Sequence, residues 1–138
     1  MTPLYAQNFD FSAFNVLAVD DIPLNLLLVQ KMLSKFNFKM RTASGGQQAL
    51  DAVAQEKPDL ILLDLMMPGI DGFEVIRRLR ENPATEDIQI VILSALNSNE
   101  DVVKGFNAGA NDFIMKPIIM EKLLSCVVNQ LKLAEAKK

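Results

Sequence analysis

The sequence contains no histidine. Its absence excludes Ser-His-Asp and Cys-His catalysis, a histidine-ligated metal, and a role as a phosphohistidine carrier. Any chemistry must therefore use carboxylates, lysine, serine and the backbone. The single cysteine, Cys126, cannot form an internal disulfide and lies in an apolar helical pattern, which is typical of a buried structural thiol.

Targeting and membrane signals are also missing. Residues 1–14 contain no Lys or Arg and no continuous apolar run, unlike a secretory signal peptide. No apolar stretch approaches the roughly 20 residues that span a bilayer, because Asp64 interrupts the best candidate. We therefore expect a cytoplasmic protein that makes no membrane contact.

Positive and negative residues are both spread along the chain, and neither sign dominates one region. The net charge is −3, both signs are mixed, and the cluster of Arg77, Arg78 and Arg80 is most simply a solvated helix face. The electrostatic pattern of a nucleic-acid-binding protein is absent, so we expect no direct contact with nucleic acid. With 138 residues, half of them apolar, the chain is long enough for one domain with a buried core.

Apolar runs alternate with amphipathic segments five times after residue 14. Strands are predicted at 15–19, 38–43, 59–63, 89–93 and 111–115. The intervening helices are predicted at about 28–36, 44–54, 71–82, 98–108 and from 120 onward. Capping-box patterns, Ser44 with Gln47 and Asp71 with Glu74, mark two helix starts. Five such units predict a doubly wound α/β fold, a five-stranded parallel sheet with helices on both faces.

Two of these helices carry an apolar stripe at helical spacing. The first stripe consists of Leu28, Val29, Met32, Leu33 and Phe36. The stripe of the last helix consists of Met120, Leu123, Leu124, Val127, Val128 and Leu131. Both stripes are expected to face the core.

The domain is predicted to cover 15–134, between an extension at 1–14 and a tail at 135–138. The extension contains four aromatic residues, Tyr5, Phe9, Phe11 and Phe14. Either their side chains pack on the domain, or the extension is not part of the domain. The polar chain end, 134–138, is expected to fray.

Polar residues follow four of the five predicted strands. Asp20 and Asp21 end the first strand, Asp64 the third, Ser94 the fourth and Lys116 the fifth. Because the carboxyl ends of parallel strands form one crevice, these five side chains are expected to converge.

Each of these residues also has a plainer structural explanation. Asp20 and Asp21 could cap the following helix, Ser94 could satisfy a loop backbone, and Lys116 could be a surface lysine. Asp64 is harder to explain in this way, because a carboxylate directly after a buried strand needs charge partners. All five explanations would have to hold together, so a functional site is favoured.

The charges at this crevice indicate the ligand. Three clustered carboxylates repel one another, and Lys116 supplies only one positive charge. A hard divalent cation fits oxygen ligands of this kind, and Mg²⁺ is the one we expect. No G-x-x-x-x-G-K-[ST] motif is present and Gly45-Gly46 is too slight a signal, so no nucleotide cofactor site is expected.

Four motifs at these positions resemble those of the response-regulator receiver domains of bacterial two-component signalling. They are V-D-D at 19–21, L-L-D-L-M-M-P-G-I-D-G at 62–72, L-S-A at 93–95 and G-A-N-D-F-I-M-K-P at 109–117. Together they are highly specific, and the resemblance covers about 15–133. It implies a flavodoxin-like (βα)5 fold like that of the chemotaxis regulators, and a phosphorylated regulatory switch rather than an enzyme.

The resemblance also implies how the phosphoryl group and the metal are held. Asp64 would accept the phosphoryl group from a phosphohistidine on a sensor histidine kinase or a histidine phosphotransfer protein. Asp21 and Asp64 would bind Mg²⁺ directly, and Asp20 would act through water. The backbone carbonyl of Met66 would be a third direct ligand.

The resemblance further implies a switch. Lys116, preceding a cis peptide bond to Pro117, would pair with the phosphoryl oxygens. Ser94 would move inward to bond the phosphoryl group, vacating space for Phe113. This would repack the surface of the fourth helix, fifth strand and fifth helix, through which a homodimer could form. The family often has Tyr at the position of Phe113, so packing alone must carry this switch.

Three other functions remain open from the sequence. A receiver that acts only as an interaction module, without phosphorylation, would not need all three of Asp20, Asp21 and Asp64. A haloacid-dehalogenase-type phosphatase usually has a second Asp where this chain has Met66. A flavodoxin-like electron carrier gives no reason for three carboxylates beside a flavin phosphate. The D-D-I-P-L-N motif at 20–25 resembles receivers of hybrid histidine kinases and diguanylate cyclases, so the chain is either free-standing or one receiver of a larger protein.

Overall fold

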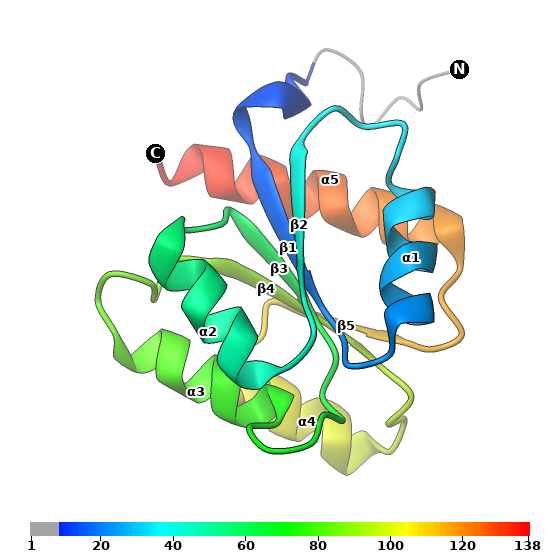
Figure 1. Cartoon of the computed structure of the whole chain (residues 1–138), viewed down its shortest axis with the longest axis vertical. Helices are drawn as coiled ribbons and strands as arrows, with labels where there is room; N and C mark the ends of the chain where they lie inside the picture. The colour runs from blue at the N-terminus through cyan, green and yellow to red at the C-terminus, as the bar shows by residue number, and fades with distance from the viewer. Residues whose placement is uncertain (1–8) are drawn as a thin grey trace.

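A five-stranded parallel sheet forms the centre of the computed structural model, which describes residues 9–138 (Figure 1). Its strands, in the order β2-β1-β3-β4-β5, are β1 (Asn15–Val19), β2 (Lys39–Ala43), β3 (Leu60–Leu63), β4 (Gln89–Ser94) and β5 (Asp112–Met115). The helices are α1 (Pro23–Met32), α2 (Gly46–Gln55), α3 (Gly72–Glu81), α4 (Asn99–Ala108) and α5 (Met120–Ala136). The predicted doubly wound α/β fold is confirmed.

Helices cover both faces of the sheet, α1 and α5 on one side and α2, α3 and α4 on the other (Figure 1). Along β1, Val16 and Ala18 pack in the core beneath α1 and α5, whereas Leu17 and Val19 pack beneath α2 and α3. This alternation follows from the two-residue period of a strand. All four residues of β3 are buried, as their apolar composition predicts for a central parallel strand.

The register of the strands brings their carboxyl ends to one edge. Val19 pairs with Leu63, so Asp20 and Asp64 follow directly on neighbouring strands. The Asp64 amide donates to the Val19 carbonyl at 3.0 Å, and the Lys116 amide donates to the Ser94 carbonyl at 2.8 Å. The backbone ladder therefore fixes the positions from which the polar side chains project.

The two capping-box predictions have different outcomes. Asp71 caps α3 by accepting a hydrogen bond from the Glu74 amide at 2.9 Å, as predicted. The Ser44 pattern is wrong, because α2 begins later, after Gly45, and has no side-chain cap. A Cβ added at Gly46, the first residue of α2, would collide with the carbonyl oxygen of Ile70, so only glycine fits where the helix begins.

Two residues predicted to face the core are exposed instead. Leu28 on α1 is 47% exposed and Met120 at the start of α5 is 48% exposed. Apart from Asn25, the N-terminal half of α1 is apolar, and Leu24 and Leu27 are also exposed, so spacing alone could not identify its buried side. Small differences at element ends, such as the start of β2 at Lys39 instead of residue 38, are ordinary.

The end of α5 contacts the rest of the domain, and the fraying expected for 134–138 stays a prediction. The helix continues to Ala136, and the Lys137 ammonium donates to the Asp87 carbonyl at 3.1 Å and to the Gln89 side chain. The Lys138 ammonium lies 3.4 Å from a carboxylate oxygen of Asp59. Throughout the described residues 9–138, no helix combines the length and apolar character needed to cross a membrane.

The part of the N-terminal extension that the structure describes packs on the domain. A short 3-10 helix, η2 (Phe11–Ala13), places the Phe11 ring with its centroid 4.5 Å from that of Phe36. The rings of Phe9 and Phe14 stack with centroids 5.2 Å apart. Phe11 and Phe14 therefore belong to the buried core. Tyr5 lies outside the described residues.

Candidate functional site

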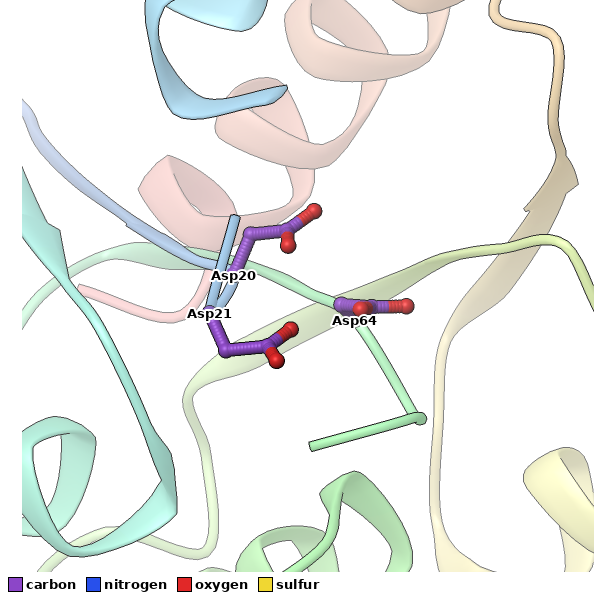
Figure 2. A group of neighbouring side chains, drawn as sticks. All are labelled: Asp20, Asp21 and Asp64. Atoms are coloured by element: carbon purple, nitrogen blue, oxygen red, sulfur yellow. The ribbon is translucent and has the colours of Figure 1, made fainter. Parts of the chain in front are cut away.

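Three carboxylates meet where β1 and β3 end (Figure 2). One oxygen from each of Asp20, Asp21 and Asp64 lies within 4.8 Å of the other two. Asp20 and Asp64 are each 6% exposed, and Asp21 is half-buried. The predicted convergence of these three residues is thus observed.

Lys116 reaches the same cluster from the end of β5. Its ammonium nitrogen lies 3.0 Å from Oδ2 of Asp20 and 3.9 Å from Oδ1 of Asp64. The following peptide bond, between Lys116 and Pro117, is cis, as predicted. The side chain is largely buried, so this ion pair is not a solvent-screened surface pair.

Asp20 is held by three donors. Its Oδ1 accepts from the Ile22 amide at 2.9 Å, and its Oδ2 accepts from the Asn25 side chain at 3.1 Å and from Lys116. The N-cap of α1 is Ile22, without a side-chain capping bond, so Asp20 does not serve as the cap. The sequence analysis places Asn25 in the D-D-I-P-L-N motif at 20–25 but gives it no role in the site, because the motif does not specify where the Asn25 side chain points.

Gly72 allows the loop after Asp64 to fold back tightly. Its amide donates to the Leu65 carbonyl at 3.1 Å, and a Cβ added there would lie 2.6 Å from the Asp64 carbonyl oxygen. Only glycine fits so close an approach without a shift of the backbone. Gly72 lies within a family motif, but the sequence alone does not show that its lack of a side chain supports the site.

The environment of Asp64 disfavours its negative charge. Burial raises the pKa of this carboxyl, and the Asp20 carboxylate raises it further. The Lys116 ammonium and the backbone amides of Met66 and Leu65 lower the pKa, but the net direction is upward. A cation at this site would therefore relieve a charge that the fold holds at a cost.

This raised pKa predicts that Asp64→Asn stabilises the protein when metal is chelated. Between the ordinary pKa of 3.8 and the raised folded value, the folded state binds more protons than the unfolded state. Stability contributed by Asp64 is therefore lost as pH rises through that window. Urea unfolding from pH 4 to 7 should show Asn increasingly more stable than Asp, with the difference constant at higher pH.

Asp51→Asn is the matched control, because Asp51 is exposed on α2 away from the carboxylate cluster. Its difference in stability from wild type should be small beside that of Asp64→Asn. Added Mg²⁺ should reduce the stability advantage of Asp64→Asn, because the metal binds and stabilises only the protein that retains all three carboxylates. An Asp64→Asn protein that is less stable than wild type at pH 7 without metal would contradict the role given to burial.

Ser94 ends β4, and Phe113 lies in the adjacent strand β5. Ser94 is fully buried, and its hydroxyl oxygen accepts from the Leu96 amide at 3.2 Å. Phe113 packs against α4 so closely that a Cβ added to Gly105 would lie 3.2 Å from its ring. In this structure the Ser94 hydroxyl thus satisfies a backbone amide of the loop that follows β4, which is the structural role that the sequence analysis considered for Ser94.

The donor set fits Mg²⁺. Magnesium takes oxygen ligands at about 2.1 Å in an octahedron, so opposite ligands lie about 4.2 Å apart. The three carboxylate oxygens lie within 4.8 Å of one another, close enough for a single Mg²⁺ to be held among them directly or through water. The carbonyl of Met66 stays a predicted ligand, and Met66 as a residue is 57% exposed.

Comparisons with known proteins agree with this arrangement. The sequence model of the family described as response regulator receiver domain matches residues 16–128. Response regulator PleD of Caulobacter vibrioides is 44% identical over 103 residues, which cover 75% of this chain and 23% of that protein. Protein PilH of Pseudomonas aeruginosa is 34% identical over 112 residues, covering 81% of this chain and 93% of PilH.

A solved structure of a receiver domain has the same fold as this chain. The signal receiver domain of a signal transduction histidine kinase from Syntrophus aciditrophicus is 30% identical, with a TM-score of 0.80, covering 86% of this chain and 90% of that one. Because the family model matches most of the sequence and the fold agrees, the chain belongs to the response regulator receiver family.

Proposed function

We propose that this chain is a Mg²⁺-dependent phosphoacceptor switch, with Asp64 as the acceptor and a sensor histidine kinase or histidine phosphotransfer protein as the donor. The observation that carries this proposal is the arrangement of Asp64 itself. It is a buried carboxylate with two further carboxylates and an ammonium beside it, at the edge where a partner can approach. Membership of the receiver family supports the same role.

The transfer needs little covalent help from the protein. An oxygen of Asp64 would bond to phosphorus as the phosphorus–nitrogen bond of the donor breaks, leaving the imidazole. Phosphoryl transfer depends mainly on positioning and on neutralising charge. Lys116, 3.9 Å from Asp64, would move from Asp20 toward the incoming phosphoryl oxygens.

Asp21 and Asp64 would hold the metal directly, with Asp20 acting through water and Met66 through its carbonyl. A bound Mg²⁺ supplies positive charge that offsets the repulsion between carboxylate and phosphoryl group. Asp20 already has three protein donors, which suits an outer position.

Incubation with acetyl phosphate and Mg²⁺ should add one phosphoryl group, measured as the intact mass. Asp64→Asn should remove the labelling, because the amide is not a nucleophile of this kind. Asp71→Asn is the control: Asp71 lies in the same loop, and Asn can still cap α3. Equal labelling of Asp64→Asn and wild type would refute the assignment.

The response to phosphorylation would pass through Ser94 and Phe113. The added charge of about −1.5 to −2 would draw the Ser94 hydroxyl away from the Leu96 amide and toward the phosphoryl oxygens. Phe113 would then move inward from its contact with Gly105 and repack the surface of α4, β5 and α5. Asn107 on α4 and Lys122 on α5 are exposed and are expected to meet a partner or a second copy. Lys104, which helical phase predicts on the same surface, instead places its ammonium 4.2 Å from the ring centroid of Phe73 on α3.

Ser94→Ala should therefore accept the phosphoryl group but lose most of the response on this surface. Amide chemical shifts at Gly105 and Phe113, measured with and without beryllofluoride, report the response. Ser125→Ala is the control, because Ser125 is exposed on α5 and bonds only within its own helix turn. Full wild-type shifts in Ser94→Ala would rule out the coupling.

A further inference from the structure

A cavity of about 310 Å³ lies between α1 and the sheet, beside the loop that joins β5 to α5. Ligand pockets begin at roughly 300 Å³, so this space has the size of a small-molecule site. Of the residues with a proposed role in phosphorylation or metal binding, only Asp20 and Lys116 line this cavity, at its polar end. The proposed function therefore gives no reason for the rest of the cavity.

The walls of the cavity are apolar. Ala18, Leu62 and Leu93 contribute from the sheet, and Val29 and Met32 from α1. The strand residues and Val29 are buried. These walls cannot orient a polar ligand, so they select an apolar body.

The cavity is open to solvent on one side. Leu28 and Pro117 also line it, and both are exposed. A ligand could therefore enter between α1 and the β5–α5 loop without unfolding either element.

Its polar end is acidic. Asp20, Asn25 and Lys116 line this end, and the oxygens of Asp21 and Asp64 lie close behind Asp20. Three carboxylates against one ammonium leave an excess of negative charge when no metal is present. An anionic ligand would be repelled, whereas a cationic one would be attracted. A carboxylate offers about four acceptor positions, and Asp20 uses three of them.

We propose that this cavity is a binding site for a small amphipathic amine, with an apolar body beneath α1 and an ammonium group at Asp20. A dry cavity of about 150 Å³ accommodates benzene, so twice that volume suits a body of roughly a dozen non-hydrogen atoms. The ammonium takes the unused acceptor position of Asp20 or replaces Lys116 there.

Occupation of the site has a consequence for Asp64, which rests on the proposed function. A displaced Lys116 needs to move little to pair with Asp64, from which it is 3.9 Å away. Two cations would then offset two of the three negative charges of the acidic cluster and compete with Mg²⁺. The amine is therefore an inhibitor of phosphorylation that acts from the face of α1.

Binding can be tested with three probes that share one apolar body: 2-naphthylmethylamine, 2-naphthylmethanol and 2-naphthylacetate. Titration of chelator-treated protein, followed by amide shifts, should show the amine binding at least tenfold more tightly than the acid, with the alcohol between them. The shifts should map to Ala18, Val29 and Leu93. Equal or tighter binding of the acid, or no binding of the amine, would overturn the proposal.

Val29→Phe fills the cavity without touching the carboxylates and should weaken amine binding at least tenfold, while Mg²⁺ binding and labelling by acetyl phosphate persist. Met32→Phe serves the same purpose if Val29→Phe is poorly folded. Undiminished amine binding in a folded, filled variant would place the amine at the carboxylates alone and refute the cavity site. In wild type, saturating amine should slow labelling; absence of labelling without amine would instead count against the proposed function.

Discussion

Replacing Met66 with Asn and Leu96 with Ser is expected to speed loss of the phosphoryl group from Asp64 by about 10²-fold. Hydrolysis needs a water in line with the oxygen–phosphorus bond, and positioned polar or basic groups contribute effects of about this size. Met66 and Leu96 lie in the loops after β3 and β4, two residues beyond Asp64 and Ser94. Both are bulky and apolar, so they can cover the phosphoryl group but cannot orient a water.

The rate is measured as phosphate release from labelled protein after removal of acetyl phosphate. Met120→Asn is the control, since it exchanges an exposed methionine on α5 for the same polar residue. An unchanged or slower rate in the double variant would show that these two side chains do not set the lifetime. A slow wild-type rate implies that resetting depends on a partner phosphatase or on transfer back to the donor.

Phe11→Ala is expected to lower the free energy of unfolding by about 3–5 kcal/mol, the usual range for truncating a buried phenylalanine. Phe11 is 8% exposed, and its ring contacts those of Phe9 and Phe36 at centroid distances of 5.0 Å and 4.5 Å. Its loss leaves a cavity at the end of the core that α1 and α5 cover.

Urea unfolding of the two proteins measures the difference. Phe106→Ala is the control, because Phe106 is exposed on α4 and its truncation should change stability by well under 1 kcal/mol. A loss below about 1 kcal/mol in Phe11→Ala would mean that the extension rests on the domain without stabilising it.

The sequence predicts the position of the site well, because that position depends on topology. Buried strands, each followed by a polar residue, are visible as a pattern, and parallel topology brings their ends together. Asp20, Asp21, Asp64 and Lys116 converge for this reason. The cis bond after Lys116 was predicted from the family motif and is present.

Contacts between distant elements could not be predicted in the same way. The bond from Asn25 to Asp20 and the pairing of Lys116 with Asp20 depend on side-chain directions that no spacing specifies. Ser44 is a residue type that often caps helices, but α2 begins after Gly45, where the backbone of Gly46 passes close to Ile70. In each case a tertiary contact overrides or supplements a local preference.

Arg80 shows the same limit for charged residues. It was assigned to a solvated helix face together with Arg77 and Arg78, which do pair with Glu74. Its guanidinium instead is half-buried and donates to the carbonyls of Gly109, at 2.9 Å, and Ile88, at 2.6 Å. Burial lowers the pKa of Arg80. Composition cannot separate these neighbours, because the difference comes from the loops before β4 and after α4, which supply the acceptors of Arg80.

The central claim is that the phosphoryl group is carried on Asp64. The most direct measurement is reduction of the phosphorylated protein with borohydride, which converts an aspartyl phosphate into homoserine, followed by peptide sequencing by mass spectrometry. We predict homoserine at position 64, formed only when Mg²⁺ was present during labelling. Homoserine at position 20, 21 or 71 instead of 64, or phosphate on a serine, would contradict the account.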